Sequence, residues 1–251
     1  MDEQTLAKIE GRNPVLEALR AGRPIHKIMI SKNAKGAVRE IIALARAKNI
    51  PIQEVDPTFI QNLSEGKTSQ GIIAMAAAKE YANLDDLLDI PEKRREEPFF
   101  VILDGIEDPQ NLGSIVRTAE AAGVHGIILG KHRAAGLTEA VGKVSAGALE
   151  YLPVARVTNI SQTIEVLQKK GVWVVGADPE GESMFHSPNR VNGAVALVIG
   201  SEGKGLTRLV KDKCDFILSL PMMGRIQSLN ASAAAAVFIY ETLRQRLQTS
   251  L

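Results

Sequence analysis

The sequence predicts an α/β protein made of two domains, and three observations support this. The chain has 251 residues, which is enough for one large domain or two smaller ones. Short apolar runs typical of buried strands alternate with segments whose apolar residues recur at helical spacing. A charged stretch bounded by prolines, EKRREE at residues 92–97, separates two such series. We therefore expect one domain over residues 1–78, a linker over 79–98 and a second domain over 99–251.

The first domain is predicted to be a small α/β module. Residues 13–21 are expected to form a helix, with Pro14 at its first position and Asn13 as its cap. The remaining expected elements are strands over 27–30, 52–55 and 71–78, and helices over 36–48 and 57–63.

Positive charge is concentrated in this first domain. Residues 8–48 hold ten basic and three acidic side chains, although the whole chain has a net charge of only +1. Such an excess is what contact with RNA phosphates requires. The basic side chains that we expect to face RNA are Arg12, Arg20, Arg23, Lys27, Lys32 and Lys35.

The second domain is predicted to hold a parallel sheet with helices on both faces. Its apolar runs are continuous rather than alternating, which is typical of strands buried on both sides. The expected strands span 99–104, 124–129, 172–177, 195–199 and 216–220, and the expected helices span 115–122, 161–170 and 231–247. Ligands of such sheets bind beyond the carboxyl ends of the strands. We therefore expect functional loops after Asp104, Ile199 and Leu220.

The composition argues against several classes of protein. The single cysteine, Cys214, cannot form an intramolecular disulfide, which argues against a secreted scaffold, and we expect it to be a buried structural residue. No signal-peptide core and no run of about 18 apolar residues occurs, so we expect a cytoplasmic protein without a membrane span. The four histidines are dispersed, which predicts no metal site.

The loop after Asp104 leads into the first helix of the second domain. Asn111 lies where that helix begins, so a capping role is the simplest interpretation for it. Arg117 is either a surface side chain or a charge in need of a partner. The second interpretation follows because Val116 and Ala119 beside it predict a largely buried helix.

The second functional loop contains three glycines, Gly200, Gly203 and Gly205. It approaches a phosphate-binding P-loop, but Lys204 precedes the last glycine and Leu206 follows it, so the required order fails. Glycines allow a ligand to come close to the backbone. The loop is therefore either part of a binding site or a glycine turn without a ligand.

The third functional loop, residues 220–230, precedes an alanine-rich helix. Ser228 or Asn230 is a candidate N-cap for this helix. The alanines at its beginning suit close packing, either within the core or at a dimer interface.

Together the three loops resemble the signature motifs of the SpoU (TrmH-type) RNA 2′-O-ribose methyltransferases. The matching stretches are NLGSIVRTAEAAG at 111–123, VIGSEGKGL at 198–206, LPM at 220–222 and SLNAS at 228–232. Residues 11–19, GRNPVLEAL, also look like the opening of the family's 23S rRNA guanosine-2′-O-methyltransferases. The resemblance covers nearly the whole chain.

This resemblance implies a fold, a cofactor and partners. The fold is a SPOUT α/β sheet whose C-terminal segment forms a trefoil knot, preceded by an L30e/L7Ae-like RNA-binding domain. The implied cofactor is S-adenosylmethionine, and the implied partners are 23S rRNA and a second copy of the chain bound through the catalytic domain. The implied cofactor-binding residues are Gly200, Glu202, Gly203, Leu220, Ser228, Leu229 and Asn230. The implied catalytic residues are Asn111, Arg117, Glu202, Ser228 and Asn230.

These residue types suit methyl transfer to a ribose 2′-hydroxyl. The hydroxyl is a poor nucleophile near neutral pH, so its proton must be accepted or shifted as it attacks. The resemblance makes Arg117 the activator, although a guanidinium stays protonated in proteins. Arg117 is thus either the base or a cation that stabilises developing negative charge. Asn111 and the polar residues of the third loop would position the ribose, and Glu202 would orient the arginine or its own loop.

Two other functions stay open. One is a tRNA ribose methyltransferase of the same family. The other is a non-catalytic RNA-binding or ribosome-assembly protein that keeps only the fold. The presence of Asn111, Arg117, Glu202 and Asn230 argues against the second alternative.

Overall fold

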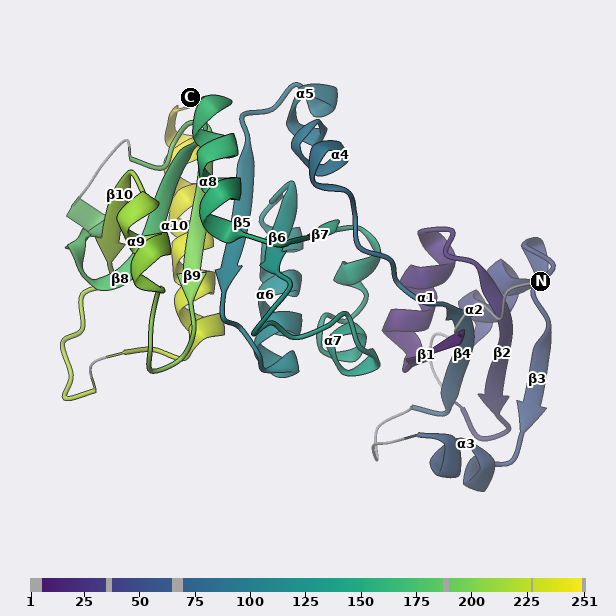
Figure 1. The fold of residues 1–251 in the computed structure, drawn as a ribbon. Coiled ribbons are helices and arrows are strands. Elements are labelled where there is room, and N and C mark those ends of the chain that lie inside the picture. The colour runs from purple at the N-terminus through teal and green to yellow at the C-terminus, as the bar shows by residue number, and fades with distance from the viewer. Residues whose placement is uncertain (1–5, 35–37, 65–69, 187–189, 227, 250–251) are drawn as a thin grey trace. The chain divides into compact units, whose positions relative to one another are not determined.

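The structure is a computed structural model that describes residues 6–34, 38–64, 70–186, 190–226 and 228–249 (Figure 1). The chain divides into two compact units. The first unit comprises Met1–Glu80 and Leu137–Tyr151, and the second comprises Tyr81–Gly136 and Leu152–Leu251. This differs from the expected contiguous domains, because a segment from the second half of the chain belongs to the first unit.

The first unit is built on a four-stranded sheet in the order β1-β4-β2-β3. Its strands are β1 (Leu6–Glu10), β2 (Ile25–Ser31), β3 (Ile52–Val55) and β4 (Ile72–Ala77), and its first helices are α1 (Arg12–Arg20), α2 (Val38–Ala47) and α3 (Pro57–Leu63). Strand β4 runs antiparallel to β1 and β2, whereas β3 is parallel to β2. The predicted α/β module is confirmed. Strand β1 was not predicted, and α1 is capped by Gly11 rather than by Asn13.

The inserted segment Leu137–Tyr151 completes the first unit with helix α7 (Glu139–Val144) and the 3-10 turn η1 (Ala148–Glu150). Arg23 forms an ion pair with Glu150 at 2.6 Å, and both side chains are largely buried. The Tyr151 hydroxyl donates a hydrogen bond to Glu17 at 2.6 Å. Because a buried charge needs its partner, these contacts fix the segment to the module.

The second unit contains a six-stranded sheet in the order β10-β8-β9-β5-β6-β7. Its strands are β5 (Phe99–Asp104), β6 (Gly126–Gly130), β7 (Val154–Val157), β8 (Trp173–Ser183), β9 (Val195–Gly200) and β10 (Phe216–Ser219). All neighbouring strands are parallel. The predicted parallel sheet is confirmed, and β5 spans the predicted residues, whereas β7 was not predicted.

Helices cover both faces of this sheet, as the apolar strands require (Figure 1). They are α4 (Leu84–Leu88), α5 (Ile90–Arg94), α6 (Pro109–Ala121), α8 (Ile160–Lys169), α9 (Arg208–Lys213) and α10 (Ala231–Thr249). Helix α6 packs against α10, and α8 packs against α9. The sheet therefore presents the carboxyl ends of its strands, and the loops that follow them, to solvent.

The linker predicted over residues 79–98 is not a separate segment, because the second unit begins at Tyr81, although the charged stretch 92–97 is exposed as expected. Residues 79–98 include α4 and α5, and Leu87 is fully buried in the core of the second unit. A Cβ atom on Gly126 would lie 2.5 Å from the Leu87 side chain, so glycine is required where α4 meets the sheet. The many charged residues in and around α5 made the segment look like a loop, so the sequence did not predict the apolar contact of Leu87.

Arg246 of α10 fastens the C-terminal helix to the sheet. Its guanidinium donates hydrogen bonds to the carbonyl oxygens of Glu97, Pro98 and Gly193. It also lies 4.5 Å from the centre of the Phe99 ring. Burial lowers its pKa to about 10, so the charge is kept at neutral pH.

We expect Arg246→Ala to destabilise the protein by about 2–4 kcal/mol, because buried carbonyl groups lose a charged donor. Urea unfolding followed by circular dichroism measures this. The matched control is Arg244→Ala, because Arg244 is exposed and pairs with Glu241 on its own helix. That change should cost less than about 1 kcal/mol. Equal losses of unfolding free energy in the two variants would contradict the role of Arg246 in holding α10 against the sheet.

Candidate functional site

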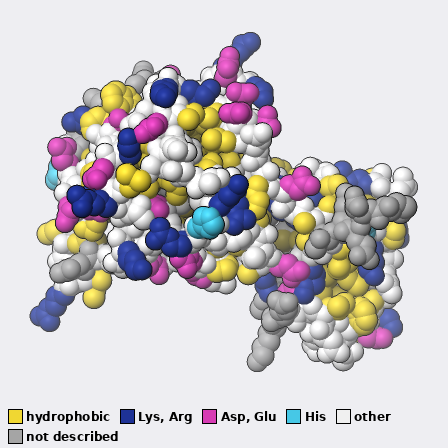
Figure 2. Space-filling view, viewed as in Figure 1, with side chains coloured by type: hydrophobic (Ala, Val, Ile, Leu, Met, Phe, Trp, Pro, Cys, Tyr) yellow, Lys and Arg dark blue, Asp and Glu magenta, His cyan; other side chains and the backbone are white. Residues whose placement is uncertain are grey.

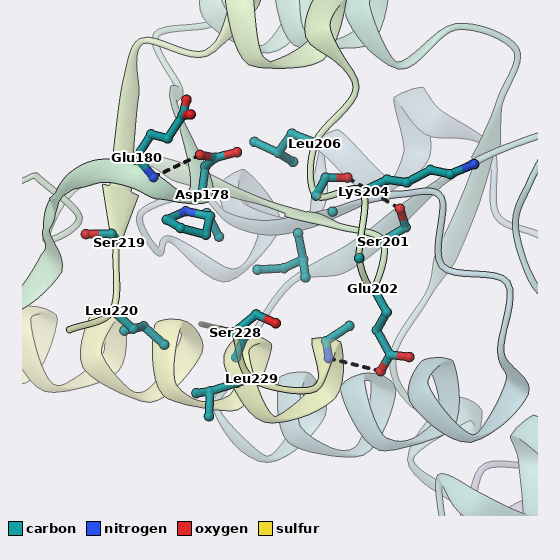
Figure 3. Close-up of a pocket in the computed structure, with 18 of the residues that line it drawn as sticks. Asp178, Glu180, Ser201, Glu202, Lys204, Leu206, Ser219, Leu220, Ser228 and Leu229 are labelled. Atoms are coloured by element: carbon teal, nitrogen blue, oxygen red, sulfur yellow. Dashed lines mark hydrogen bonds between the residues drawn. The ribbon is translucent and has the colours of Figure 1, made fainter. Parts of the chain in front are cut away.

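A pocket of about 750 Å³ lies where the middle of β8 meets the loops that follow β9 and β10 (Figure 3). It is lined by every residue that the sequence assigned to the cofactor, namely Gly200, Glu202, Gly203, Leu220, Ser228, Leu229 and Asn230. Ile199, Met222 and Phe238 add apolar surface to its walls. A large, mostly apolar cavity with a few polar groups is typical of a cofactor site.

The glycine loop forms one wall of this pocket. Ser201 and Gly205 exchange backbone hydrogen bonds of 3.1 and 2.9 Å, which folds residues 201–205 into a tight hairpin. A Cβ atom on Gly200 would overlap the backbone of Gly205, so only glycine fits there. Beyond the hairpin, buried Asp104 accepts a hydrogen bond of 2.7 Å from the backbone N–H of Thr207. The loop is therefore held in place at both ends.

Three polar side chains, one from the first turn of α6 and two from separate loops, meet beside the pocket. The Asn111 amide nitrogen donates to Glu202 Oε1 at 3.1 Å, and Asn111 Oδ1 accepts from Asn230 Nδ2 at 2.9 Å. Asn230 Nδ2 also donates to Glu202 Oε1. The backbone N–H of Ala231 gives the same carboxylate oxygen a further contact at 3.3 Å. The predicted catalytic residues Asn111, Glu202 and Asn230 thus form one connected cluster.

The predicted helix-capping role is wrong for Asn111 and confirmed for Asn230. Helix α6 is capped by Asp108, whose carboxylate accepts from the N–H groups of Gln110 and Asn111. The Asn111 side chain is therefore available for the polar cluster. Asn230 does cap α10, because its Oδ1 accepts from the N–H groups of Ser232 and Ala233. Its Nδ2 serves the cluster at the same time, so the structural and functional interpretations both hold for this residue.

Of the two interpretations of Arg117, the structure agrees with the surface side chain and not with a charge buried in the helix. Val116 and Ala119 are fully buried on α6, but Arg117 projects from the opposite side of the helix and is exposed. Among the described residues, no hydrogen bond or ion pair engages its side chain, and it does not line the pocket. Within one chain, Arg117 is therefore separate from the cluster around Glu202.

The basic residues predicted to face RNA also differ in their surroundings. Arg23 does not face solvent as predicted, because its guanidinium is buried against Glu150 and the Ala77 carbonyl. Arg20 is held by Glu17 and Glu40, and Lys32 by Asp56, although these pairs remain at the surface.

The remaining three predicted RNA contacts are Arg12, Lys27 and Lys35. Lys27 is exposed on β2, and Arg12 is partly buried at the beginning of α1. Lys35 lies outside the described residues.

The predicted site residues do not include several charged residues of the pocket, among them Asp178 and Lys211. Asp178 of β8 and Lys211 of α9 both line it, and they form an ion pair of 2.9 Å. Hydrogen bonds to Glu180 and Asp178 raise the pKa of Lys211, so its charge persists. Asp178 directly follows the strand predicted over residues 172–177. The rule that ligands bind at carboxyl ends of strands could have identified it.

Cys214 is a structural residue. Burial, together with the charges of Asp215 and Asp104, raises the pKa of its thiol to about 12. The Sγ atom donates to the Val210 carbonyl at 3.3 Å. This places the thiolate far from its reactive range.

We expect iodoacetamide to alkylate native Cys214 at least about 100-fold more slowly than the urea-unfolded chain near pH 8, since only the thiolate reacts. Mass spectrometry of timed samples measures both rates. Similar rates in the two states would contradict the burial of this thiol.

The described residues contain no group of three or more His, Cys, Asp or Glu side chains placed to hold a metal ion. In that same part of the chain, no helix is both long and apolar enough to cross a bilayer.

Comparison with known protein families gives two matches that together span most of the chain. Residues 98–240 match the profile of the SpoU rRNA methylase family. Residues 8–82 match a profile described as RNA 2′-O ribose methyltransferase substrate binding. YacO of Bacillus subtilis strain 168, provisionally named as a TrmH family tRNA/rRNA methyltransferase, is 49% identical over 237 residues, which cover 94% of each chain.

Solved structures share the fold over almost the full length. The SpoU methyltransferase AviRb from Streptomyces viridochromogenes, in complex with the cofactor AdoMet, has a TM-score of 0.79 and 27% identity, covering 96% of this chain and 90% of AviRb. An AdoMet-bound rRNA methyltransferase from Sinorhizobium meliloti also has a TM-score of 0.79 and 27% identity, covering 97% of this chain and 88% of that one. These likenesses confirm the predicted SpoU-type α/β fold with its N-terminal substrate-binding domain.

Proposed function

The chain belongs to the SpoU rRNA methylase family, and on this premise we propose that it transfers a methyl group from S-adenosylmethionine to a ribose 2′-hydroxyl of RNA. The observation that carries the proposal is the hydrogen-bonded cluster of Asn111, Glu202 and Asn230 beside a cofactor-sized pocket. Neither a binding module nor a ribosome-assembly protein would need three polar side chains from separate segments at this place.

The residues of the pocket suit S-adenosylmethionine. Leu220 and Leu229 offer apolar surface for an adenine ring. The glycine loop after β9 offers backbone N–H and C=O groups for hydrogen bonds to the cofactor. The carboxylates of Asp178 and Glu202 provide negative charge for a cationic ligand. When bound, this cofactor supplies an electrophilic methyl group on a sulfonium. The same loops are those expected to form the trefoil knot, which would enclose the ligand.

The polar cluster is proposed to hold the ribose. Glu202 anchors the amides of Asn111 and Asn230, which fixes their remaining hydrogen-bonding groups toward an incoming hydroxyl. Ser228 lines the same pocket and adds a hydroxyl at its open side. Arg117 then supplies positive charge for the developing alkoxide.

Because Arg117 lies outside the cluster of its own chain, we place it in the site of a second copy. Helix α6, which carries it, packs against α10, and α10 exposes Tyr240 and Leu247, with 49% and 59% of their surfaces accessible. Apolar side chains on these helices suit a two-fold interface. The proposed enzyme is therefore a homodimer through the catalytic domain, with each active site completed by the partner's arginine.

Mixing two inactive variants tests this arrangement. We expect Asn111→Ala and Arg117→Ala proteins to be inactive alone and to regain about a quarter of wild-type activity after co-refolding, because half the dimers are mixed and each holds one intact site. Labelled methyl transfer to RNA measures the recovery. If both residues serve the same chain's site, mixing restores nothing.

The RNA substrate is proposed to be a guanosine of 23S rRNA. The N-terminal unit matches a substrate-binding profile, and residues 11–19 resemble the opening of guanosine-specific rRNA enzymes. A tRNA ribose is the second candidate, favoured by the mixed tRNA/rRNA naming of the Bacillus relative and of relatives from Staphylococcus.

Incubation with labelled S-adenosylmethionine and either transcribed 23S rRNA fragments or tRNA tests the proposed substrate. We expect label in rRNA at one alkali-resistant dinucleotide, because a 2′-O-methyl group blocks cleavage at that position. Label confined to tRNA would replace the rRNA assignment. Cofactor binding without transfer to any ribose would overturn the proposed activity.

A further inference from the structure

A second cavity lies on the other side of the glycine loop. It has a volume of about 310 Å³ and shares Ser201, Lys204 and Gly205 with the wall of the larger pocket. Its outer side is formed by Glu107 and Arg133 from loops that follow β5 and β6. A volume of this size lies at the lower end of ligand-binding pockets.

Positive charge dominates this cavity. Lys204 and Arg133 both line it, and among the described residues neither forms an ion pair or a side-chain hydrogen bond. Of the two acidic residues present, Asp104 is buried and occupied by the Thr207 N–H group. Arg208, a third cation that lines the cavity, pairs with Asp212 of its own helix at 3.8 Å. Only the exposed Glu107 could offset Lys204 and Arg133. An anion is therefore the ligand that this charge distribution attracts.

The backbone at Arg133 supports a binding role. Arg133 has a φ angle of 51°, in the left-handed region that glycine or asparagine occupies at lower cost. The loop is held by a hydrogen bond of 2.8 Å from the Ala135 N–H to the Ile106 carbonyl, which fastens it to the segment after β5. Strained residues held in this way concentrate at functional sites.

The two cavities are arranged as neighbouring subsites. Figure 3 shows Glu202 directed toward the beginning of α10 and Lys204 leaving the loop in a different direction. Only Gly203 separates them, so their Cα atoms are at most about 7 Å apart. A ribose held at the Glu202 cluster would therefore place its adjoining phosphate within reach of Lys204.

We propose that the cavity lined by Lys204 and Arg133 binds an RNA phosphodiester next to the ribose that is methylated. This inference rests on the proposed function and assigns the substrate contacts at its site. Lysine and arginine bind phosphate through charge-assisted hydrogen bonds, and each contact releases counterions from the RNA. Binding here would fix the nucleotide on one side of the glycine loop while the cofactor pocket occupies the other.

The test is the double variant Lys204→Gln with Arg133→Gln in the full-length protein. We expect RNA affinity, measured with a labelled single-stranded rRNA fragment, to fall at least tenfold at low salt. The slope of log affinity against log salt should decrease in magnitude by about 1.4, since each lost contact with a single strand removes about 0.7. The charge-conserving change Lys204→Arg should keep the wild-type affinity and slope.

Matched controls separate this effect from a general loss of charge. Lys170 and Arg94 are exposed and precede β8 and β5, at the opposite edge of the sheet, so Lys170→Gln with Arg94→Gln should leave RNA affinity within twofold. Calorimetry with S-adenosylmethionine should give wild-type affinity for the single variant Arg133→Gln, because Arg133 does not line the cofactor pocket. The inference is overturned if the double variant keeps its RNA affinity and salt slope, or if its RNA loss only parallels a loss of cofactor affinity. Failure of the wild-type protein to methylate RNA would instead overturn the proposed function.

Discussion

Replacing Asn111 with alanine should lower the rate of methyl transfer by at least about 100-fold, the usual effect of removing a positioned hydrogen-bonding group. Its side-chain amide is hydrogen-bonded to both Glu202 and Asn230, and Asn111 is only 7% exposed. Alanine would leave the carboxylate of Glu202 with one donor fewer and the amide nitrogen of Asn230 with one acceptor fewer. The ribose would then lose its fixed position relative to the methyl group.

Affinity for the cofactor should stay within twofold in this variant, because Asn111 does not line the large pocket. Single-turnover methyl transfer and calorimetry measure the two quantities. Gln110→Ala is the matched control, since Gln110 is exposed on the same turn of α6 and contributes only its backbone N–H to the cap. Wild-type transfer by Asn111→Ala would remove this residue from the site.

Replacing Gly200 with alanine should abolish cofactor binding. The added Cβ atom would overlap the carbonyl group of Gly205 and the N–H group of Leu206, which are backbone atoms that cannot rotate away. The hairpin that forms the pocket wall would have to move as a whole. Overpacking of this kind costs about 1–3 kcal/mol, and more when backbone is displaced.

A glycine without such neighbours provides the control. Gly142 lies within α7, and no atom lies within 4 Å of a Cβ atom built there. Gly142→Ala should stabilise the protein by about 0.5–1 kcal/mol, because alanine favours the helix. Thermal unfolding with and without S-adenosylmethionine measures both variants. If the cofactor stabilises the Gly200→Ala protein as strongly as the wild type, the close packing of Gly200 against the backbone of Gly205 is not required for binding.

The sheet of the second unit was predictable because its strands carry an unambiguous signal. β5 is apolar at nearly every position and is buried on both faces, so its bounds follow from the sequence alone. β7 is only four residues long and carries the exposed Arg156 in its centre, which hides it among loops. α4 and α5 were missed for a similar reason, because charged residues outnumber the few apolar contacts that bury them.

The loops that line the pocket were predictable because ligands of a parallel sheet bind beyond the carboxyl ends of its strands, and the individual residues were implied by the family resemblance. The surroundings of individual charges were not predictable. Arg23 forms an ion pair with Glu150, which lies 127 positions away, and no local sequence pattern predicts that pair. Arg117 is exposed because α6 turns its other side toward the sheet, and one residue of helix rotation separates it from buried Val116. Such contacts depend on how distant segments pack.

The most direct test of the account is a map of ribose methylation in rRNA and tRNA from cells with and without this protein. The account predicts that one guanosine of 23S rRNA loses its 2′-O-methyl group in the deletion strain. The wild-type gene should restore that group, whereas the Asn111→Ala gene should not. Unchanged ribose methylation throughout both RNA classes, or restoration by Asn111→Ala, would contradict the assignment of ribose methylation to the cluster of Asn111, Glu202 and Asn230.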